Sequence, residues 1–588
     1  MNKKVKITRF IWLYIFTGVC FLGIVLRLIF LQTITSDSSN DIVLKTLSLT
    51  EKDAAPRGKI YDRNGTVLAT NRQGYIVLIK KGDEKSQELT LKNLAQLFNT
   101  PIDDLKNDLA EYGFSYNNPY VFLQDADIKT VIKLKESPEK YPCVEILTSP
   151  VREYLYPDTA VHLLGRCGLI SKEEFEKLSG YLRNDIIGKQ GAEKAFEEIL
   201  RGIDGVRAKE KYTKEKVKKF ADDTPPVSGK DIILTIDLNL QQATEEALDK
   251  VINMSKDAVG GAVVIMDVNS GEVLASASNP DYDIREFNKK YKELSNDKNK
   301  PFFNRSLSGL YEPGSTFKPI TALAALQSGV LTPSEKIKTL GKYEYFDRVF
   351  RCNIYREKGK THGRIDVSEA LSVSCNYFFY ELGKRVGIDE ISRYAHLFGL
   401  NSATGIELSS EEAIGTIATP DNRKARGGYW YAGDTLQAAI GQSDNQFTPV
   451  ALCNYAAALA NGGTLYSAHI LKGVCENENK ISYTEPKVLN TLDILPKTMQ
   501  TIREGMLMVT KSGTAKDVFS DFLIDVAGKT GTAQRGGRTN GLFIGYAPAD
   551  DPEISFCVVV EGGASGNQAA RILKEILANY FNTDEKGN

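Results

Sequence analysis

Apolar residues recur along the chain with two periods, one typical of β-strands and the other typical of α-helices. Short apolar runs of strand length occupy residues 232–236, 262–266, 273–277, 543–546 and 554–560. Apolar positions at helical spacing occupy residues 91–98, 128–134, 240–252 and 569–581. Asn-Gly at residues 64–65 and Asn-Ser-Gly at residues 269–271 stand between apolar runs, and both predict β-hairpin turns.

The order of these segments predicts an α+β protein. In the second half of the chain, strands lie near both ends, and the pattern from residue 315 to about 465 is mostly helical. We therefore expect an antiparallel sheet flanked by helices, with a helical subdomain packed on it. Residues 208–229 are rich in Lys and contain a Pro-Pro pair, which disfavours a packed core and predicts a domain boundary.

A long apolar segment near the N-terminus predicts a membrane-spanning helix. Residues 10–31 are mostly apolar, apart from Arg27 near the far end, and are long enough to cross a bilayer. Basic residues crowd residues 1–9, and none follows Arg27 until Lys45. The positive-inside rule then puts the N-terminus in the cytoplasm and the bulk of the chain outside. A cleaved signal peptide is the alternative, but residues 32–34 offer no small-x-small cleavage site.

Composition narrows the function classes. The chain of 588 residues carries 74 Lys and Arg against 75 Asp and Glu, a net charge of -1. This balance gives no electrostatic footprint for nucleic acid, so we expect no nucleic-acid partner. The eight Cys residues are sparse and irregularly spaced, which is not the pattern of a disulfide scaffold.

The tetrapeptide Ser-Thr-Phe-Lys at residues 315–318 carries the first candidate chemistry. It follows a Pro-Gly pair and precedes an apolar run, and this pattern predicts the start of a helix. Residues three apart on a helix share a face, so Lys318 can reach the hydroxyl of Ser315. A buried Lys can lose its charge and then serve as the base that activates a Ser hydroxyl.

Two further segments complete a known set of motifs. Ser374 and Asn376 flank Cys375, and Lys-Thr-Gly-Thr occupies residues 529–532. Ser-x-x-Lys, Ser-Asp-Asn and Lys-Thr-Gly in this order are the signature of penicillin-binding proteins and class A β-lactamases. This chain departs from the middle motif by carrying Cys375 in place of Asp. Ser374 and Asn376 can share one side only if their segment is extended or a turn, so we predict that it is not helical.

The chain resembles a class B penicillin-binding protein, a bitopic D,D-transpeptidase, over nearly its whole length. Three segments outside the catalytic set carry the resemblance. They are Arg57-Gly58 with Asp62-Arg63-Asn64-Gly65, Arg152 with Tyr156-Pro157 and His162-Leu163-Leu164-Gly165, and Gly188-Lys189-Gln190-Gly191 with Glu193 and Leu200-Arg201-Gly202. The division and sporulation branch of the family looks nearest.

The resemblance implies three parts and a set of partners. Residues 1–34 would be the cytoplasmic tail and transmembrane helix, residues 35–220 an elongated pedestal of the dimerisation type, and residues 221–588 the transpeptidase domain. Peptidoglycan stem peptides would be the substrates and β-lactam antibiotics the covalent inhibitors. A polytopic glycosyltransferase of the shape, elongation, division and sporulation family would dock on residues 50–205 at the membrane. The chemistry would need no cofactor.

The resemblance also implies a role for each residue that handles the reacting bond. Ser315 would attack the carbonyl of a D-alanyl-D-alanine stem peptide, with Lys318 as general base. Ser374 would pass the proton to the leaving amine of the terminal D-alanine. Asn376 would hold the amide of the donor peptide and orient Lys318.

The Lys-Thr-Gly-Thr segment would hold the end of the substrate. The charge of Lys529 and the hydroxyls of Thr530 and Thr532 suit a substrate carboxylate. Gly531 would let the ligand approach the backbone closely. By resemblance, the backbone N–H groups of Ser315 and Thr532 would form the oxyanion hole.

A membrane-anchored β-lactamase or β-lactam sensor is the alternative function, and a non-enzymatic scaffold is a third. A class A β-lactamase would carry Glu-x-x-Leu-Asn between Asn376 and Lys529 to activate water. The nearest match runs from Glu485 to Asn490 and is one residue too long. This difference favours transfer to an amine over hydrolysis, with D-alanyl-D-alanine carboxypeptidase activity as a side reaction that the resemblance allows.

Cys352, His362 and Cys375 form a pattern that the catalytic set does not explain. Three interpretations stay open: buried Cys residues with an unrelated surface His, a disulfide between Cys352 and Cys375, and a structural zinc site. A closed zinc site needs a fourth ligand, for which Asp347 and Asp366 are candidates. Such a site would support the Ser-x-Asn segment from behind.

Overall fold

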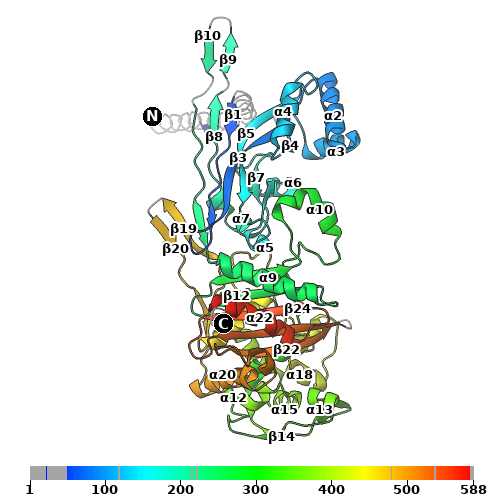
Figure 1. Cartoon of the computed structure of the whole chain (residues 1–588), viewed down its shortest axis with the longest axis vertical. Helices are drawn as coiled ribbons and strands as arrows, with labels where there is room; N and C mark the ends of the chain where they lie inside the picture. Colours follow the sequence, from blue (N-terminus) through cyan, green and yellow to red (C-terminus); the bar gives the residue numbers. More distant parts are fainter. Residues whose placement is uncertain are drawn as a thin grey trace, which may run out of the picture.

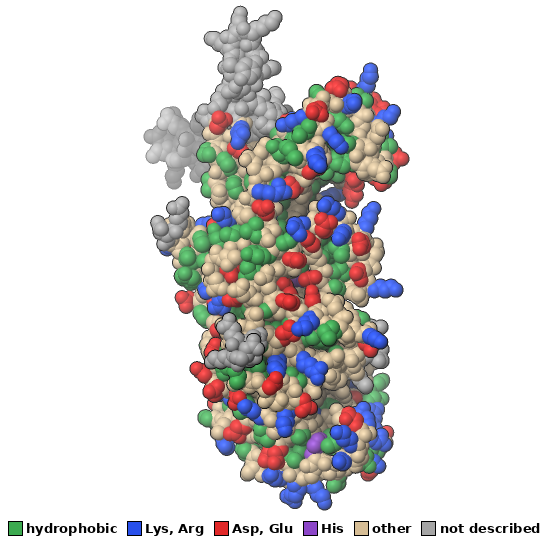
Figure 2. Space-filling model, in the orientation of Figure 1, with side chains coloured by type: hydrophobic (Ala, Val, Ile, Leu, Met, Phe, Trp, Pro, Cys, Tyr) green, Lys and Arg blue, Asp and Glu red, His purple; other side chains and the backbone are tan. Residues whose placement is uncertain are grey.

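The computed structural model describes residues 21–22, 50–116, 119–208, 210–213, 216–219, 223–477, 480–535 and 538–582. Two domains follow one another along the longest axis of an elongated molecule (Figure 1). On the face drawn in Figure 2, acidic and basic side chains are interspersed over both domains. This mixture matches the near-zero net charge of the sequence.

The predicted membrane helix falls almost wholly outside the described residues. Of residues 10–31, the structure describes Phe21 and Leu22, which are helical and exposed. Among the residues that it describes, no helix has the length and apolar character needed to cross a bilayer. The membrane anchor therefore stays a prediction.

The pedestal is built on a seven-stranded sheet that takes strands from both halves of the chain. Its order is β20-β19-β11-β2-β3-β4, and β5 pairs with β3 along the full length of β5. The strands are β2 (Ile60–Tyr61), β3 (Val67–Ile79), β4 (Tyr120–Leu123), β5 (Val144–Tyr154), β11 (Asp231–Leu234), β19 (Leu471–Asn477) and β20 (Lys480–Tyr483). A hairpin from far along the chain thus completes the sheet of the first domain.

The predicted hairpin at Asn64-Gly65 is confirmed, because β2 and β3 pair antiparallel on either side of it. Gly65 adopts φ +88°, which a residue with a Cβ rarely does. The Asp62 carboxylate accepts the N–H groups of Asn64 and Thr66 at 2.9 and 2.7 Å. This Asp therefore fixes the turn that starts the longest strand of the pedestal.

Three helices cover one face of this sheet. They are α2 (Glu84–Phe98), α3 (Ile102–Tyr112) and α4 (Ile128–Glu136). Asp83 and Asp127 cap α2 and α4 by accepting backbone N–H groups, which fixes where these helices begin. The predicted helices at 91–98 and 128–134 are confirmed, and their apolar faces enclose a separate small core with β3.

Residues 210–213 and 216–219 of the Lys-rich stretch form part of an arm at the far end of the pedestal (Figure 1). There β1 (Thr50–Asp53) pairs with β8 (Gly205–Ala208), and β9 (Glu210–Thr213) pairs with β10 (Lys216–Lys219). The chain returns through a bridge between Ile203 and Val227. The boundary predicted between residues 220 and 221 lies outside the described residues and stays a prediction.

Short elements connect the pedestal to the second domain. They are α5 (Val161–Leu164), β6 (Cys167–Leu169), α6 (Lys172–Lys177), β7 (Ile186–Gly188), α7 (Gly191–Ala195) and α8 (Glu197–Leu200). His162 on α5 is partly buried, with Nε2 2.8 Å from the carbonyl of Pro301 in the second domain. Burial lowers the pKa of His162 to about 4, so this ring is a neutral packing element.

The second domain centres on a five-stranded antiparallel sheet in the order β13-β12-β24-β23-β22. The strands are β12 (Gly260–Asp267), β13 (Val273–Asn279), β22 (Ala527–Arg535), β23 (Arg538–Ala547) and β24 (Ile554–Glu561). The strand predictions at 262–266, 273–277, 543–546 and 554–560 are confirmed. Residues 260–266, 273–278 and 554–560 are buried without interruption. Side chains alternate between the two faces of a strand, so both faces of this sheet are buried.

Helices cover both faces of the five-stranded sheet. On one face α9 (Leu238–Met254) and α22 (Gly566–Tyr580) pack against Val263. On the other face α19 (Pro449–Ala460) packs against Val264, the next residue of β12. The predicted helices at 240–252 and 569–581 correspond to α9 and α22 and are confirmed.

The expected helical subdomain lies between β13 and β22, at the lower end of the molecule in Figure 1. Its helices are α11 (Arg305–Ser308), η2 (Gly314–Phe317), α12 (Lys318–Gln327), α13 (Asn353–Lys358), α14 (Val367–Ser372), α15 (Asn376–Val386), α16 (Ile388–Leu397), α17 (Pro420–Ala425), α18 (Ala432–Ala438), α20 (Pro496–Lys511) and α21 (Lys516–Phe519). Short strands β14 (Ile337–Thr339), β15 (Lys342–Tyr345), β16 (Arg348–Arg351), β17 (Gly363–Ile365), β18 (Thr464–Tyr466) and β21 (Val488–Thr491) accompany them. The helices η1 (Ile284–Glu286) and α10 (Phe287–Asn296) lie instead beside the pedestal, where Phe287 packs with Val161 of α5 (Figure 1). All residues of α12 but its last are buried, so this helix forms the centre of the subdomain.

A buried ion-pair network joins the three N-terminal motifs. Glu193 is fully buried, and its carboxylate contacts Arg57 Nη2 at 2.9 Å and Arg152 Nε at 2.6 Å. Burial alone would raise the pKa of Glu193, but the two guanidinium groups, Arg152 foremost, hold it below its ordinary value. Arg152 also donates to the carbonyl of Gly58 at 2.7 Å, so the network ties β5 to the first motif.

We expect Glu193→Gln to destabilise the pedestal by about 3–5 kcal/mol, because two buried guanidinium groups would lose their counter-charge. The measurement is the free energy of unfolding from a urea titration of the purified protein. Glu198→Gln is the matched control, because Glu198 is exposed on the neighbouring helix and should leave that free energy unchanged. Equal stability of Glu193→Gln and wild type would contradict the structural role of the network.

Candidate active site

Ser315 lies in the 3₁₀ turn η2, which runs directly into α12 at Lys318. The predicted helix start after Pro313-Gly314 is therefore confirmed. Residues i and i+3 eclipse in a 3₁₀ turn, so Ser315 and Lys318 project from the same side. Ser315 is partly exposed and Lys318 is fully buried. The turn thus offers a hydroxyl at the surface of the site with an amine on its buried side.

Lys318 Nζ is held by oxygen atoms of the Ser374–Asn376 segment. It donates to Asn376 Oδ1 at 2.6 Å, to the Ser374 carbonyl at 2.9 Å and to Ser374 Oγ at 3.1 Å. Ser374 lies between α14 and α15 with φ +53°, so the segment is a turn, as predicted. Left-handed backbone at a non-Gly residue stores about 1–3 kcal/mol of strain, and the bond from Lys318 to the Ser374 carbonyl helps to hold it.

Lys529 reaches the same hydroxyl from the sheet. Its Nζ donates to Ser374 Oγ at 3.0 Å and to the carbonyl of Thr530 at 3.0 Å. Ser374 Oγ therefore accepts hydrogen bonds from two amines. A hydroxyl has two lone pairs and one proton. With both lone pairs engaged, the Ser374 proton is left to be donated to another group, which suits transfer to a leaving amine.

The two lysines lie together and are both fully buried, and this lowers both of their pKa values. Burial lowers the pKa of Lys318 to about 8. Burial also lowers the pKa of Lys529 well below its ordinary value, and the charge of Lys318 lowers it further. Two ammonium groups are therefore disfavoured here unless an anion joins them. A bound carboxylate would supply that counter-charge, so the pair favours an anionic ligand.

The Lys-Thr-Gly-Thr strand passes directly beside the Ser315 turn because both segments present glycine at the contact. A Cβ on Gly531 would lie 2.8 Å from the carbonyl oxygen of Pro313. A Cβ on Gly314 would lie 3.0 Å from the carbonyl oxygen of Thr532. This contact places the backbone of Thr532 next to the nucleophile turn. The oxyanion hole formed by the N–H groups of Ser315 and Thr532 stays a prediction.

The structure brings Cys352, His362 and Cys375 together. The two Sγ atoms are 3.9 Å apart, and Cys352 Sγ lies 3.9 Å from His362 Nδ1. Both Cys are free thiols, so the disulfide interpretation is wrong for this structure, and so is that of an unrelated surface His. Hydrogen bonding to Cys375 lowers the pKa of Cys352, whereas the same neighbour raises the pKa of Cys375. One thiol of the pair is thus ready to ionise.

Neither predicted fourth ligand joins this cluster. Among the described residues, the group that could hold a metal comprises the two Cys and His362 alone. Asp366 instead caps α14 by accepting the N–H of Glu369 at 3.0 Å. Asp347 lies in the turn between β15 and β16. Both Asp residues were proposed because they are near the cluster in sequence. Neither belongs to the group of side chains that the fold brings together.

Comparison with known proteins decides the family. The Penicillin binding protein transpeptidase domain matches residues 261–578, and the Penicillin-binding Protein dimerisation domain matches residues 52–234. The chain belongs to the class B penicillin-binding proteins. It is an enzyme of the peptidoglycan D,D-transpeptidase type, because relatives that it matches over most of their length carry that name.

Curated relatives and solved structures agree with this assignment. The Peptidoglycan D,D-transpeptidase MrdA of Haemophilus influenzae is 30% identical over 98% of this chain and 91% of its own length. Stage V sporulation protein D of Bacillus subtilis is 29% identical over 97% of this chain and 84% of its own length. A complex between penicillin-binding protein PBP2 and MreC from Helicobacter pylori has a TM-score of 0.78 at 25% identity, covering 91% of this chain and 99% of that one. The similar identities to MrdA and to the sporulation protein do not separate the branches of the family.

The penicillin-binding protein also has a site residue that the sequence analysis missed. Thr514 Oγ1 lies 2.7 Å from Thr530 Oγ1. The signal was present, because Lys-Ser-Gly-Thr at residues 511–514 is a second copy of the Lys-Thr-Gly-Thr pattern. Only the fold separates the two copies: Lys511 ends α20 and forms a half-exposed ion pair with Asp525, whereas Lys529 is fully buried.

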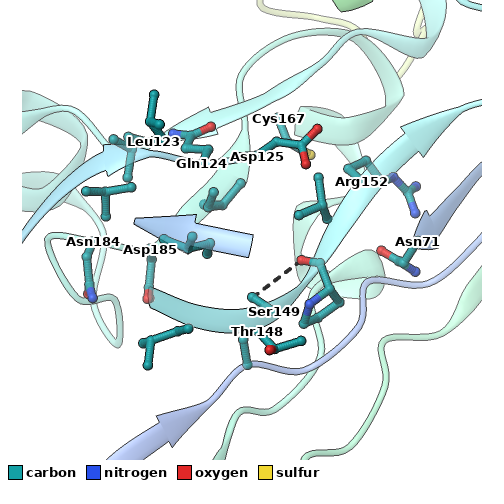
Figure 3. A pocket seen from close by; sticks show the side chains of 18 of the residues that line it. Asn71, Leu123, Gln124, Asp125, Thr148, Ser149, Arg152, Cys167, Asn184 and Asp185 are labelled. Atoms are coloured by element: carbon teal, nitrogen blue, oxygen red, sulfur yellow. Dashed lines mark hydrogen bonds between the residues drawn. The ribbon is translucent and has the colours of Figure 1, made fainter. Parts of the chain in front are cut away.

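A cavity of about 1300 Å³ lies in the pedestal, away from the catalytic residues. Figure 3 shows it from close by: Thr148, Ser149 and Arg152 come from β5, and Asp185 from the loop before β7. None of Ser315, Ser374 or the two catalytic lysines lines it. Its size therefore does not make it the catalytic site of this penicillin-binding protein.

We expect acylation of the enzyme by a penicillin to accelerate as the pH rises through about 8. Lys318 acts as a base only when it is neutral, and burial brings its pKa down to that value. Well below pH 8 the rate constant should fall roughly tenfold per pH unit, as the neutral fraction falls. Stopped-flow or quenched labelling with benzylpenicillin between pH 6 and 9 measures this. A flat profile, with circular dichroism showing an intact fold throughout, would contradict Lys318 as the base.

Proposed function

We propose that this protein cross-links peptidoglycan stem peptides through an acyl-enzyme on Ser315 and is acylated by β-lactams at the same residue. The observation that carries the proposal is the pair of buried lysines that share Ser374 Oγ beside the Ser315 turn. That arrangement supplies a neutral base and a proton donor, and it favours an anionic ligand. Each of these is needed to exchange one amide bond for another.

The geometry supports the following course of reaction. Neutral Lys318 accepts the proton of Ser315 as its Oγ forms a bond to the carbonyl carbon of the penultimate D-alanine. The bond to the nitrogen of the terminal D-alanine breaks, and Ser374 delivers a proton to that nitrogen while Lys318 returns a proton to Ser374. An amine from a neighbouring strand then attacks the ester. Neutral Lys318 accepts the proton that this amine loses and passes it to Ser315 Oγ as the ester bond breaks and the new amide forms.

Transfer to an amine is favoured over hydrolysis by what surrounds the site. The segment that most resembles the water-activating motif of β-lactamases lies elsewhere: Glu485 is exposed, and Asn490 Nδ2 donates to the carbonyl of Leu397. The oxygen atoms that hold Lys318 belong to Ser374 and Asn376, which are neutral groups. A long-lived acyl-enzyme is the consequence, with carboxypeptidase activity as a minor side reaction.

Mass spectrometry after exposure to benzylpenicillin tests the proposal. We expect one stable adduct on the peptide that contains Ser315, none in Ser315→Ala, and a lifetime of many minutes. Lys318→Ala should reduce the acylation rate by about a hundredfold or more, because it removes the general base. Rapid loss of the adduct would favour the β-lactamase alternative, and the absence of any adduct would favour a scaffold role.

A structural zinc ion at Cys352, His362 and Cys375 is part of the proposal. Zinc–thiolate bonds of about 2.3 Å in a tetrahedral site bring two sulfurs roughly 3.8 Å apart, which agrees with the 3.9 Å between these two Sγ atoms. Cys375 is adjacent to Ser374 in the turn that holds Lys318. The ion would take no part in the chemistry and would stabilise that turn from its buried side.

Metal analysis checks the zinc proposal. We expect about one zinc per chain in wild type, and a clear loss in Cys352→Ser together with a lower melting temperature and slower acylation. Cys475→Ser is the control, because Cys475 lies on β19 in the pedestal sheet and should keep the metal. Finding no zinc, with both thiols of the cluster free to react, would refute the site.

Anchoring and partners complete the proposal. A single N-terminal helix would hold the protein in the cell membrane, with the N-terminus in the cytoplasm and both described domains outside. One structural neighbour is titled as a PBP2 complex with MreC and another as a peptidoglycan synthase complex that coordinates polymerization and crosslinking. By analogy, the pedestal and its cavity would receive such a partner, including a polytopic glycosyltransferase. A role in division or sporulation is proposed from the resemblance alone, because the identities to relatives do not separate the branches.

A further inference from the structure

Thr514 touches two of the catalytic segments at once. Its backbone N–H donates to the carbonyl of Ser372 at 3.1 Å, two residues before Ser374. Its side-chain Oγ1 lies 2.7 Å from Oγ1 of Thr530 in β22. A Cβ on Gly513 would lie only 2.3 Å from the Ser372 carbonyl, so this stretch lies flat against the turn. The backbone of residue 514 thus supports one segment, and its hydroxyl is free to act on the other.

We propose that Thr514 is a positioning residue that directs the hydroxyl proton of Thr530 toward the terminal carboxylate of the donor peptide. This deepens the proposed function, on which it rests, by naming a residue that sets recognition of that carboxylate. Thr514 does not need to touch the substrate for this role. It acts through the single proton of its neighbour.

Thr530 has a single hydroxyl proton, and the acceptor of that proton decides what Thr530 can bind. A carboxylate only accepts hydrogen bonds, so Thr530 can bind it only by donating its one hydroxyl proton. If Thr530 donated to Thr514 instead, that proton would be lost to the ligand. When Thr514 donates to Thr530, one lone pair of Thr530 is satisfied and its proton is left for the carboxylate.

The surroundings of Thr530 leave the orientation of its hydroxyl to Thr514. Thr530 is 9% exposed, so little water is available to reorient its hydroxyl. Its backbone carbonyl is already taken by Lys529 Nζ at 3.0 Å. Within the described part of the chain, Thr514 Oγ1 is the hydrogen-bond partner of Thr530 Oγ1. The direction of this one hydrogen bond therefore sets what Thr530 can offer a ligand.

The test uses full-length protein in detergent, with benzylpenicillin and its methyl ester as probes. Thr514→Val removes the hydroxyl but keeps the branched shape, and Thr514→Ser keeps the hydroxyl. Both retain the backbone bond to Ser372, so the scaffold role of the segment is preserved. Ser512→Ala is the matched control, because that hydroxyl bonds to the carbonyl of Met508 and lies outside the site.

We expect Thr514→Val to lower the second-order acylation constant of benzylpenicillin by roughly three- to tenfold, through weaker binding rather than a slower chemical step. Thr514→Ser should stay close to wild type, and so should Ser512→Ala. The methyl ester lacks the carboxylate, so its acylation constant should be the same in Thr514→Val and wild type. In a Thr530→Val background, Thr514→Val should have no further effect.

Other results would overturn the proposal. Equal losses for the acid and the ester would show a structural role without carboxylate recognition. A loss that persists in the Thr530→Val background would show direct contact between Thr514 and the ligand. Wild-type behaviour of Thr514→Val, with Ser315 still labelled, would remove the role of Thr514 and leave the proposed function intact. Failure of wild type to label Ser315 is a separate outcome, which would reject the proposed function itself.

Discussion

The structure depends on one oxygen atom that two buried amines share. Ser374 Oγ accepts from Lys318 and from Lys529, and neither amine has a carboxylate partner among its hydrogen bonds. Burial makes two adjacent ammonium groups unfavourable, which is why both pKa values fall. The same shortage of negative charge favours binding of a carboxylate. The proposed base catalysis and the proposed carboxylate recognition would therefore have a single electrostatic cause.

This arrangement requires a strained turn, and several neighbours hold it. Ser374 sits in left-handed backbone, which an isolated chain would leave. Lys318 holds its carbonyl from one side, and Thr514 holds the carbonyl of Ser372. Cys375 places a thiol against Cys352 on the buried side. The turn is therefore fixed by residues that are distant in sequence, and its conformation is a property of the whole subdomain.

Much of this could be predicted from the sequence, and the failures have a common cause. Hydrophobic periodicity located the central strands, which are buried on both faces and read as continuous apolar runs, and the helices α9 and α22, which bury one face. The three catalytic motifs were found by their order, and the turn at Ser374 followed from the need to aim two side chains together. In contrast, Thr514 and the contribution of β19 and β20 to the pedestal sheet depend on packing between distant segments. Asp347 and Asp366 were proposed from nearness in sequence, which carries no information on which side chains converge.

The two domains are joined by hydrogen bonds and by strands β19 and β20, which pair in the pedestal sheet. These connections limit how a change in one domain can reach the other. β19 and β20 leave the transpeptidase domain to complete the pedestal sheet. Glu245 on α9 accepts the N–H of Ala160 in the pedestal at 2.8 Å, and burial raises the pKa of Glu245 to about 8. Glu411 accepts the N–H of Gly191 at 2.7 Å. A partner bound to the pedestal could therefore reach the Ser315 turn only by moving these contacts together, because each one spans the same junction.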